Sequence, residues 1–219
     1  MQALPRLRNL RALSSLKEAP SGAFFVTSLT SFHICAIINS NNIVVNGKTY
    51  QKTNKFIMTV NGGGNRLKFM EKWIFEHQPN QIIYGKWDDE SKEKYPDNFV
   101  ERGIVDLQDE MWETKFTFIP AFSYKSKSFV TQKFWKMLYY GIIPFVDKNG
   151  YDIDHLLPIP DFFRVENPDE MWKKIEKLEN NPDKYIECLK YFYKMLLDDY
   201  FNGKYIKDVF EPWIKKYDK

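Results

Sequence analysis

Residues 55–77, KFIMTVNGGGNRLKFMEKWIFEH, are the stretch that decides the fold. The largely apolar run over residues 55–60 predicts a buried strand. The sequence NGGGN at residues 61–65 predicts a tight loop, because glycine and asparagine favour turns. Leu67, Met70 and Ile74 then recur at helical spacing, so residues 66–77 are predicted to form a helix. A strand, a glycine turn and a helix in this order are typical of an α/β sheet.

The same alternation continues along the chain. Further strands are predicted over residues 81–86, 115–119 and 142–147, and helices over residues 107–113 and 128–140. Two later helices begin at NPDE and NPD, residues 167–170 and 181–183, where asparagine caps the helix and proline takes its first position. We therefore predict a Rossmann-like α/β domain, a parallel sheet with helices on both faces, followed by a helical C-terminal tail.

The first 50 residues lack this regularity and contain only short β-like runs at residues 23–27 and 43–45. We predict two parts: residues 1–50, an irregular segment or the remnant of an N-terminal domain, and residues 51–219, the Rossmann-like domain with its C-terminal helices. Residues 1–18 are rich in arginine and poor in acids. This composition fits a mitochondrial targeting peptide, a frayed basic arm or an artificial start, and these three readings stay open.

Length and composition exclude several classes. A chain of 219 residues allows one good core and an appendage, or two small domains, but not two full nucleotide-binding domains. The net charge of +3 is too small to indicate nucleic-acid binding by itself. Cys35 and Cys188 lack metal-ligand spacing, which favours a reduced, cytoplasmic protein, in the host cytoplasm if the source is viral. No apolar run approaches the roughly 18 residues of a membrane span.

Two loops at predicted strand ends carry the residues expected of a phosphate site. In the first, Gly63 and Gly64 allow a close backbone approach, and Arg66 follows in the first helical turn. This loop lacks the glycine spacing of a dinucleotide fingerprint and the ending of a P-loop, so a plain turn with a solvated arginine is the alternative.

The second loop surrounds a predicted helix start with hydroxyls and cations, among them Lys127, Ser128, Thr131 and Lys133. An ordinary N-cap at Ser128 in a solvated turn is the alternative. None of the three histidines, His33, His77 and His155, lies in a triad or metal motif, so no catalytic residue and no metal site is identified.

The order of these elements resembles the C-terminal, donor-binding half of GT-B glycosyltransferases, and most of all the DNA β-glucosyltransferases of T-even phages. Three blocks within residues 55–197 carry the resemblance: residues 60–75, 128–147 and 162–185. The resemblance implies one half of a GT-B fold, in which residues 51–219 bind a nucleotide-sugar, UDP-glucose in that family. It implies a hexosyltransferase that acts on a hydroxyl, including that of a hydroxymethylated DNA base.

The resemblance also implies roles for particular residues. Arg66 falls on an arginine that holds the donor diphosphate, Thr131 matches a turn near the phosphates, and Lys133 stands where the family has a cation. The donor diphosphate site implied in this way is Gly63, Gly64, Arg66, Lys127, Ser128, Thr131 and Lys133. Where the family packs a loop on uracil, this chain has Gly103, Ile104 and Val105.

Two departures limit the resemblance. The family holds the donor ribose with a glutamate, and Lys136 occupies that position, although a lysine cannot accept a hydrogen bond. The family's N-terminal domain binds acceptor DNA and supplies a catalytic aspartate, and the first 50 residues cannot form such a domain, so a separate chain is a candidate to supply it. Two alternative functions remain: a non-catalytic or truncated α/β binding module, and a DNA-binding protein that uses Lys125, Lys127 and Lys133 with the basic arm.

Overall fold

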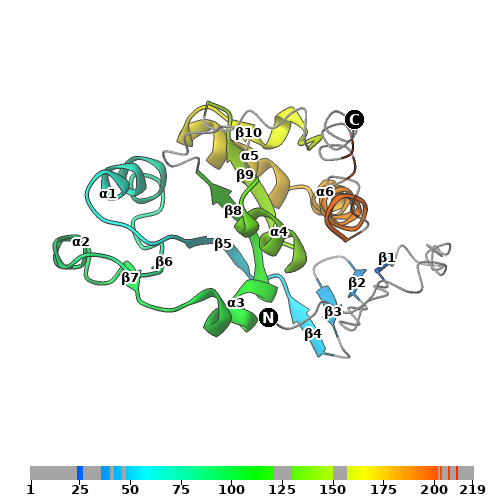
Figure 1. Ribbon diagram of the computed structural model, residues 1–219, viewed down its shortest axis with the longest axis horizontal. Coiled ribbons are helices and arrows are strands. Elements are labelled where there is room, and N and C mark those ends of the chain that lie inside the picture. Colours follow the sequence, from blue (N-terminus) through cyan, green and yellow to red (C-terminus); the bar gives the residue numbers. More distant parts are fainter. Residues whose placement is uncertain are drawn as a thin grey trace, which may run out of the picture. The chain divides into compact units, whose positions relative to one another are not determined.

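The computed structural model describes residues 24–26, 36–39, 42–45, 48–120, 130–149 and 157–201, with the single residues 203, 207 and 211 (Figure 1). By internal packing the chain divides into two units, residues 1–51 and 52–219. The predictions that residues 1–50 are an irregular segment or a domain remnant, and that residues 51–219 bind a nucleotide-sugar, stay predictions.

The first unit holds a four-stranded antiparallel sheet in the order β1-β2-β3-β4. Its strands are β1 (Phe24–Val26), β2 (Ala36–Asn39), β3 (Asn42–Val45) and β4 (Lys48–Gln51). The β-like runs predicted at residues 23–27 and 43–45 lie on β1 and β3. Strands of three or four residues are too short to show a clear alternation, which is why the sequence of this part looked irregular.

The second unit is built on a six-stranded, wholly parallel sheet. Its strands are β5 (Asn54–Thr59), β6 (Ile83–Tyr84), β7 (Phe99–Val100), β8 (Thr114–Ile119), β9 (Ile143–Asp147) and β10 (Arg164–Val165). The order in the sheet is β10-β9-β8-β5-β6-β7, so the chain first builds outward from β5 and then returns to place β8 on the other side of β5. This is the strand order of a Rossmann fold, and it confirms the predicted fold class.

Helices connect these strands (Figure 1). They are α1 (Asn65–Met70) with the π-helical turn η1 (Glu71–Phe75), α2 (Asp89–Lys94), the 3-10 turn η2 (Ile104–Leu107), α3 (Gln108–Glu113), α4 (Gln132–Tyr139), the 3-10 turn η3 (Asp161–Phe163), α5 (Pro168–Glu179), and α6 (Pro182–Met195) with the π-helical turn η4 (Leu196–Phe201). Asn167 and Asn181 cap α5 and α6 as predicted.

The core lies between the central strands and the helices. Phe116, Phe118 and Phe145 are fully buried, as expected for strands covered on both faces. The ring of Trp73 in η1 stacks on Phe118 with centroids 4.5 Å apart, and Trp172 Nε1 in α5 donates to the Trp73 carbonyl at 3.0 Å. Aromatic packing of this kind joins η1 and α5 to β8, one of the two strands that carry the loops considered next.

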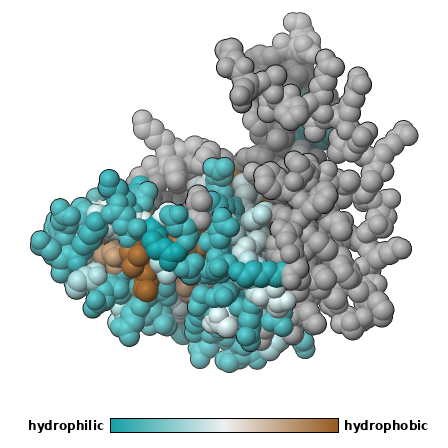
Figure 2. All heavy atoms as spheres, turned by 90° about the horizontal axis from the view of Figure 1, so that it is seen from below, coloured by the Kyte–Doolittle hydropathy of each residue, from teal (hydrophilic) through white to brown (hydrophobic). Residues whose placement is uncertain are grey.

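The surface of the described residues is predominantly polar. Tyr191, with 39% of its surface exposed, is the single large hydrophobic residue among them that is exposed. Figure 2 agrees, since hydrophilic colours cover most of the coloured surface on the face that it shows. Within the described residues, no helix is long and apolar enough to cross a membrane.

Candidate functional site

The candidate site lies where the strand order reverses, between β5 and β8 (Figure 1). From β5 the chain turns toward β6, whereas from β8 it turns toward β9 on the opposite side. The loops that leave the carboxyl ends of β5 and β8 therefore diverge, and ligands of open α/β sheets bind in the crevice that such loops leave. Residues 60–65 follow β5, and residues 130–133 belong to the connection that follows β8.

The glycine turn after β5 is held against the end of β6. Backbone hydrogen bonds join Gly62 N to Lys86 O at 3.0 Å, and the Asn61 side chain accepts from Lys86 N at 2.7 Å. A Cβ on Gly62 would lie 3.0 Å from the Trp87 ring, and a Cβ on Gly63 would lie 1.9 Å from Asp88 Oδ2. These two glycines therefore make room for the protein's own side chains.

Gly64 and Arg66 lie at the start of α1. Gly64 has φ of +53°, a left-handed conformation that favours glycine. Arg66 is exposed, and its Nη1 donates to the Asn61 carbonyl, which fixes the guanidinium beside the end of β5. A cation in this place can contact an anion at the crevice.

Lys133 is brought to the same strand end from α4. Its Nζ donates to the Thr59 carbonyl at 2.7 Å, a contact between residues 74 positions apart. Burial lowers the pKa of Lys133 to about 7, because a charged ammonium loses hydration there. Thr59 Oγ1 is buried and has no hydrogen-bond partner among the described residues. An anion beside Lys133 would restore its charge, and Thr59 has an unused hydroxyl at this place.

Thr131 is the N-cap of α4 rather than Ser128. Its side chain accepts from Phe134 N at 3.3 Å, and its backbone is extended, as a cap requires. The helix begins at Gln132, so Lys133 stands in its first turn. Lys127 and Ser128 lie outside the described residues.

The proposed base pocket follows β7. Gly103 N donates to Asp106 Oδ2 at 3.2 Å, and Gly103 precedes η2, in which Ile104 and Val105 lie. The structure describes the backbone of Ile104 and Val105 but not their side chains. Arg102 pairs with Glu110 at 2.6 Å, so the strand end next to the proposed pocket is anchored to α3.

Asp88 is the residue of this region that the sequence did not single out. It is exposed, but its carboxylate lies against Gly63 and also caps α2 by accepting from Ser91 N at 3.0 Å. Hydrogen bonds from Ser91 and then from the Gly64 N–H lower the pKa of Asp88. An aspartate just before the polar run DESKEK is the N-cap signal that could have found this role.

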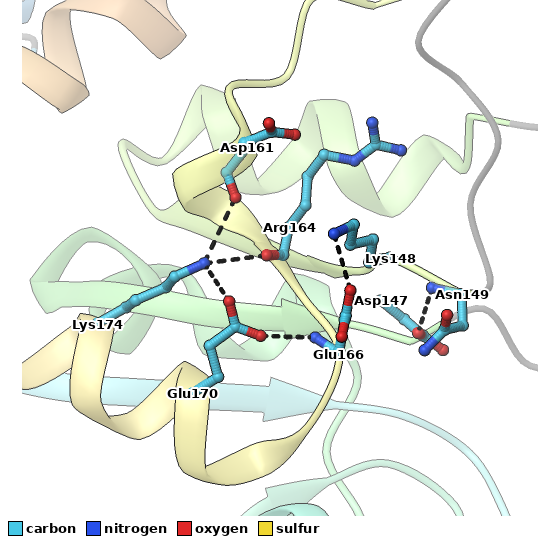
Figure 3. Close-up of polar contacts among 8 residues, drawn as sticks. All are labelled: Asp147, Lys148, Asn149, Asp161, Arg164, Glu166, Glu170 and Lys174. Atoms are coloured by element: carbon cyan, nitrogen blue, oxygen red, sulfur yellow. Dashed lines mark hydrogen bonds and ion pairs between the residues drawn. The ribbon is translucent and has the colours of Figure 1, made fainter.

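A different network stands at the carboxyl ends of β9 and β10 (Figure 3). Lys174 donates to the Arg164 carbonyl at 3.1 Å and pairs with Glu170 at 2.6 Å, while Glu170 accepts from Glu166 N at 2.9 Å. Lys148 pairs with Glu166 at 2.8 Å. In Figure 3 these charges face one another, so they are paired within this network.

Comparison with solved structures gives similar folds. The DNA-modifying enzyme β-glucosyltransferase, solved with and without uridine diphosphoglucose, matches with a TM-score of 0.58 and 18% identity over 78% of this chain and 54% of that chain. The T4 phage β-glucosyltransferase with UDP-glucose matches with a TM-score of 0.55 and 17% identity over 77% of this chain and 50% of that chain. The chain has the fold of one half of a GT-B glycosyltransferase.

This GT-B half-fold confirms the resemblance drawn from the sequence. The T4 phage enzyme with UDP and Mn²⁺ also matches, with a TM-score of 0.51 and 17% identity over 77% of this chain and 49% of that chain. The chain thus spans about half the length of these structures. No protein-family model and no curated protein matches the sequence.

Within the GT-B half-fold, Arg66, Thr131 and Lys133 lie at the carboxyl ends of β5 and β8. The two carbonyls that hold the cations, of Thr59 and Asn61, are two residues apart on an extended chain, or about 7 Å. Lys136 lies one turn further along α4. Among the described residues, no group of three or more His, Cys, Asp or Glu side chains could hold a metal ion. His77 pairs with Asp169 at 3.6 Å, away from these loops.

Proposed function

We propose that this chain binds a UDP-sugar, with UDP-glucose as the first candidate, and that it is the donor-binding half of a hexosyltransferase. The observation that carries the proposal is the contact of Lys133 with the end of β5. It places a cation and the unused Thr59 hydroxyl at the switch point of a sheet whose fold is shared with UDP-glucose-binding enzymes.

The diphosphate would be held between the two strand ends. Arg66 from the loop after β5 and Lys133 from α4 supply positive charge, and Thr131 caps a helix whose N–H groups favour anions. The set expected from the sequence also includes Gly63 and Gly64, in the turn against which Asp88 lies, and Lys127 and Ser128. Gly103, Ile104 and Val105 would form the pocket for the uracil base after β7.

The proposed reaction is a transfer of the hexose to a hydroxyl. The acceptor oxygen forms a bond to the anomeric carbon while the bond from that carbon to the diphosphate oxygen breaks. The departing diphosphate gains negative charge, which Arg66 and Lys133 stabilise. The acceptor proton passes to a base that we propose comes from a separate chain, and the acceptor class we propose is a hydroxymethylated DNA base.

Isothermal titration calorimetry with UDP-glucose tests donor binding. We expect wild-type protein to bind, and Arg66→Ala and Lys133→Met each to weaken binding about tenfold or more, because each removes a charged hydrogen-bond donor. Lys177→Met, which removes an exposed lysine from α5, is the matched control and should bind as wild type does. Absence of binding at millimolar UDP-glucose, or equal affinity of all four proteins, would refute the donor site.

A further inference from the structure

An acidic side chain sits on the glycine turn of the proposed donor site. Asp88 follows β6, and its position is set by the turn that ends this strand, where Gly85 adopts φ of +141°. The Gly85 position cannot carry a side chain, since a Cβ there would lie 2.3 Å from the Val60 carbonyl. A bridge between Gly62 and Trp87 then continues the pairing of the two strands. The carboxylate of Asp88 is thereby pressed against Gly63.

The Asp88 carboxylate is both fixed and available. Its hydrogen bonds to Ser91 N and to the Gly64 N–H hold it in one orientation. They also keep it ionised, because they favour the charged form. A carboxylate has about four acceptor positions, and Asp88 is exposed, so positions remain open for a ligand. An ionised, oriented and accessible carboxylate is a strong acceptor for hydroxyl groups.

The place of Asp88 along the sheet edge matches the middle of a nucleotide. The neighbouring strands β7, β6, β5 and β8 follow one another in the sheet. The carboxyl ends of β7, β6 and β5 present, in this order, the proposed base pocket at Gly103, then Asp88, then the glycine turn with Arg66, and the Lys133 ammonium contacts the same end of β5. At about 4.8 Å between strands, the row from β7 to β5 spans about 10 Å. In a nucleoside diphosphate the ribose likewise lies between the base and the phosphates.

Charge decides which part of the ligand suits Asp88. A carboxylate repels a phosphate but accepts hydrogen bonds from the neutral hydroxyls of a ribose. Lys136, at the position of the family's ribose-binding glutamate, cannot accept such bonds. We propose that Asp88 accepts hydrogen bonds from the ribose hydroxyls of the donor and so selects a ribonucleotide over a deoxyribonucleotide. This inference rests on the proposed donor site and names the residue that replaces the missing glutamate.

Calorimetry with UDP and 2′-deoxy-UDP on the full chain tests this role. Wild type should prefer UDP by about tenfold or more, since a hydrogen bond to a charged group is lost with the 2′-hydroxyl. Asp88→Asn should weaken the preference, because its amide oxygen is an uncharged acceptor, and Asp88→Ser should lose it. Both residues still cap α2, because asparagine and serine are good N-caps, and thermal melting verifies the fold. Asp89→Asn, which removes the neighbouring exposed charge in the same helix, is the matched control and should keep the preference.

Three results would overturn the inference. If wild type binds UDP and 2′-deoxy-UDP equally, the proposed donor site is retained, but Asp88 does not bind the 2′-hydroxyl of the ribose. If Asp88→Asn binds UDP and pyrophosphate more tightly than wild type, the carboxylate is an internal anion that competes with phosphate. If wild type binds no UDP at all, the proposed function fails, and the ribose role fails with it.

Discussion

The charge of Lys133 makes donor binding depend on pH in a way that can be calculated. Burial lowers the pKa of Lys133 to about 7 in the free protein. A bound diphosphate favours the charged form, so it raises this pKa, and above pH 7 the protein must take up a proton when it binds. UDP-glucose is the suitable ligand, because both phosphate groups of its diphosphate keep their charge throughout this range. Affinity should therefore fall as the pH rises through 7.

The size of the effect follows from the charged fraction of Lys133. With a pKa of about 7, roughly 90% of the molecules carry the charge at pH 6, roughly 10% at pH 8 and roughly 1% at pH 9. If only the charged form binds the diphosphate, the dissociation constant rises about tenfold from pH 6 to pH 8 and about a hundredfold from pH 6 to pH 9. The protein should take up about 0.9 proton per site at pH 8.

Calorimetry in buffers of different ionisation enthalpy measures both the affinity and the proton uptake. Lys133→Arg keeps a positive charge at every pH used, so its affinity should stay nearly constant from pH 6 to pH 9. Lys177→Met should follow the wild-type profile. A flat profile in wild type, or an equal slope in Lys133→Arg, would refute the assignment of the buried charge to the diphosphate.

Two further predictions concern contacts that shape the site. Gly63→Ala should push Asp88 off the turn and weaken the cap of α2, lowering the free energy of unfolding by about 1–2 kcal/mol and removing the preference for UDP over 2′-deoxy-UDP. An unchanged urea midpoint with the preference intact would contradict this. Trp172→Phe should cost about 1–3 kcal/mol in urea unfolding, because it leaves the buried Trp73 carbonyl without its donor. A cost near zero would show that this bond does not hold α5 against η1.

Much of the fold could be predicted from local sequence patterns. The strand, glycine turn and helix of residues 55–77 are present as β5, α1 and η1, because an apolar run, a glycine cluster and a helical period each act over a few residues. The asparagine caps of α5 and α6 were predicted for the same reason. These signals identify the fold class but not the order of the strands in the sheet.

Short elements escaped the sequence patterns. Helix α2 was not predicted, because its six residues, DESKEK, have no apolar period. It forms where Asp88 caps it, and the one side chain that it buries is that of Ser91. Strand β7 has only two residues and was missed for a similar reason. Two residues cannot show an alternation, and this strand exists because β6 pairs with it.

The sequence alone determined which residues could bind an anion, because residue type and local spacing set the charge and the turn. It identified Arg66, Thr131 and Lys133 as candidates and noted that Lys136 cannot accept hydrogen bonds. Only the tertiary structure joined Lys133 to Thr59, 74 residues away, and set Asp88 on Gly63. The physical reason is that sheet pairing decides which strand ends become neighbours, and burial beside β5 then lowers the pKa of Lys133.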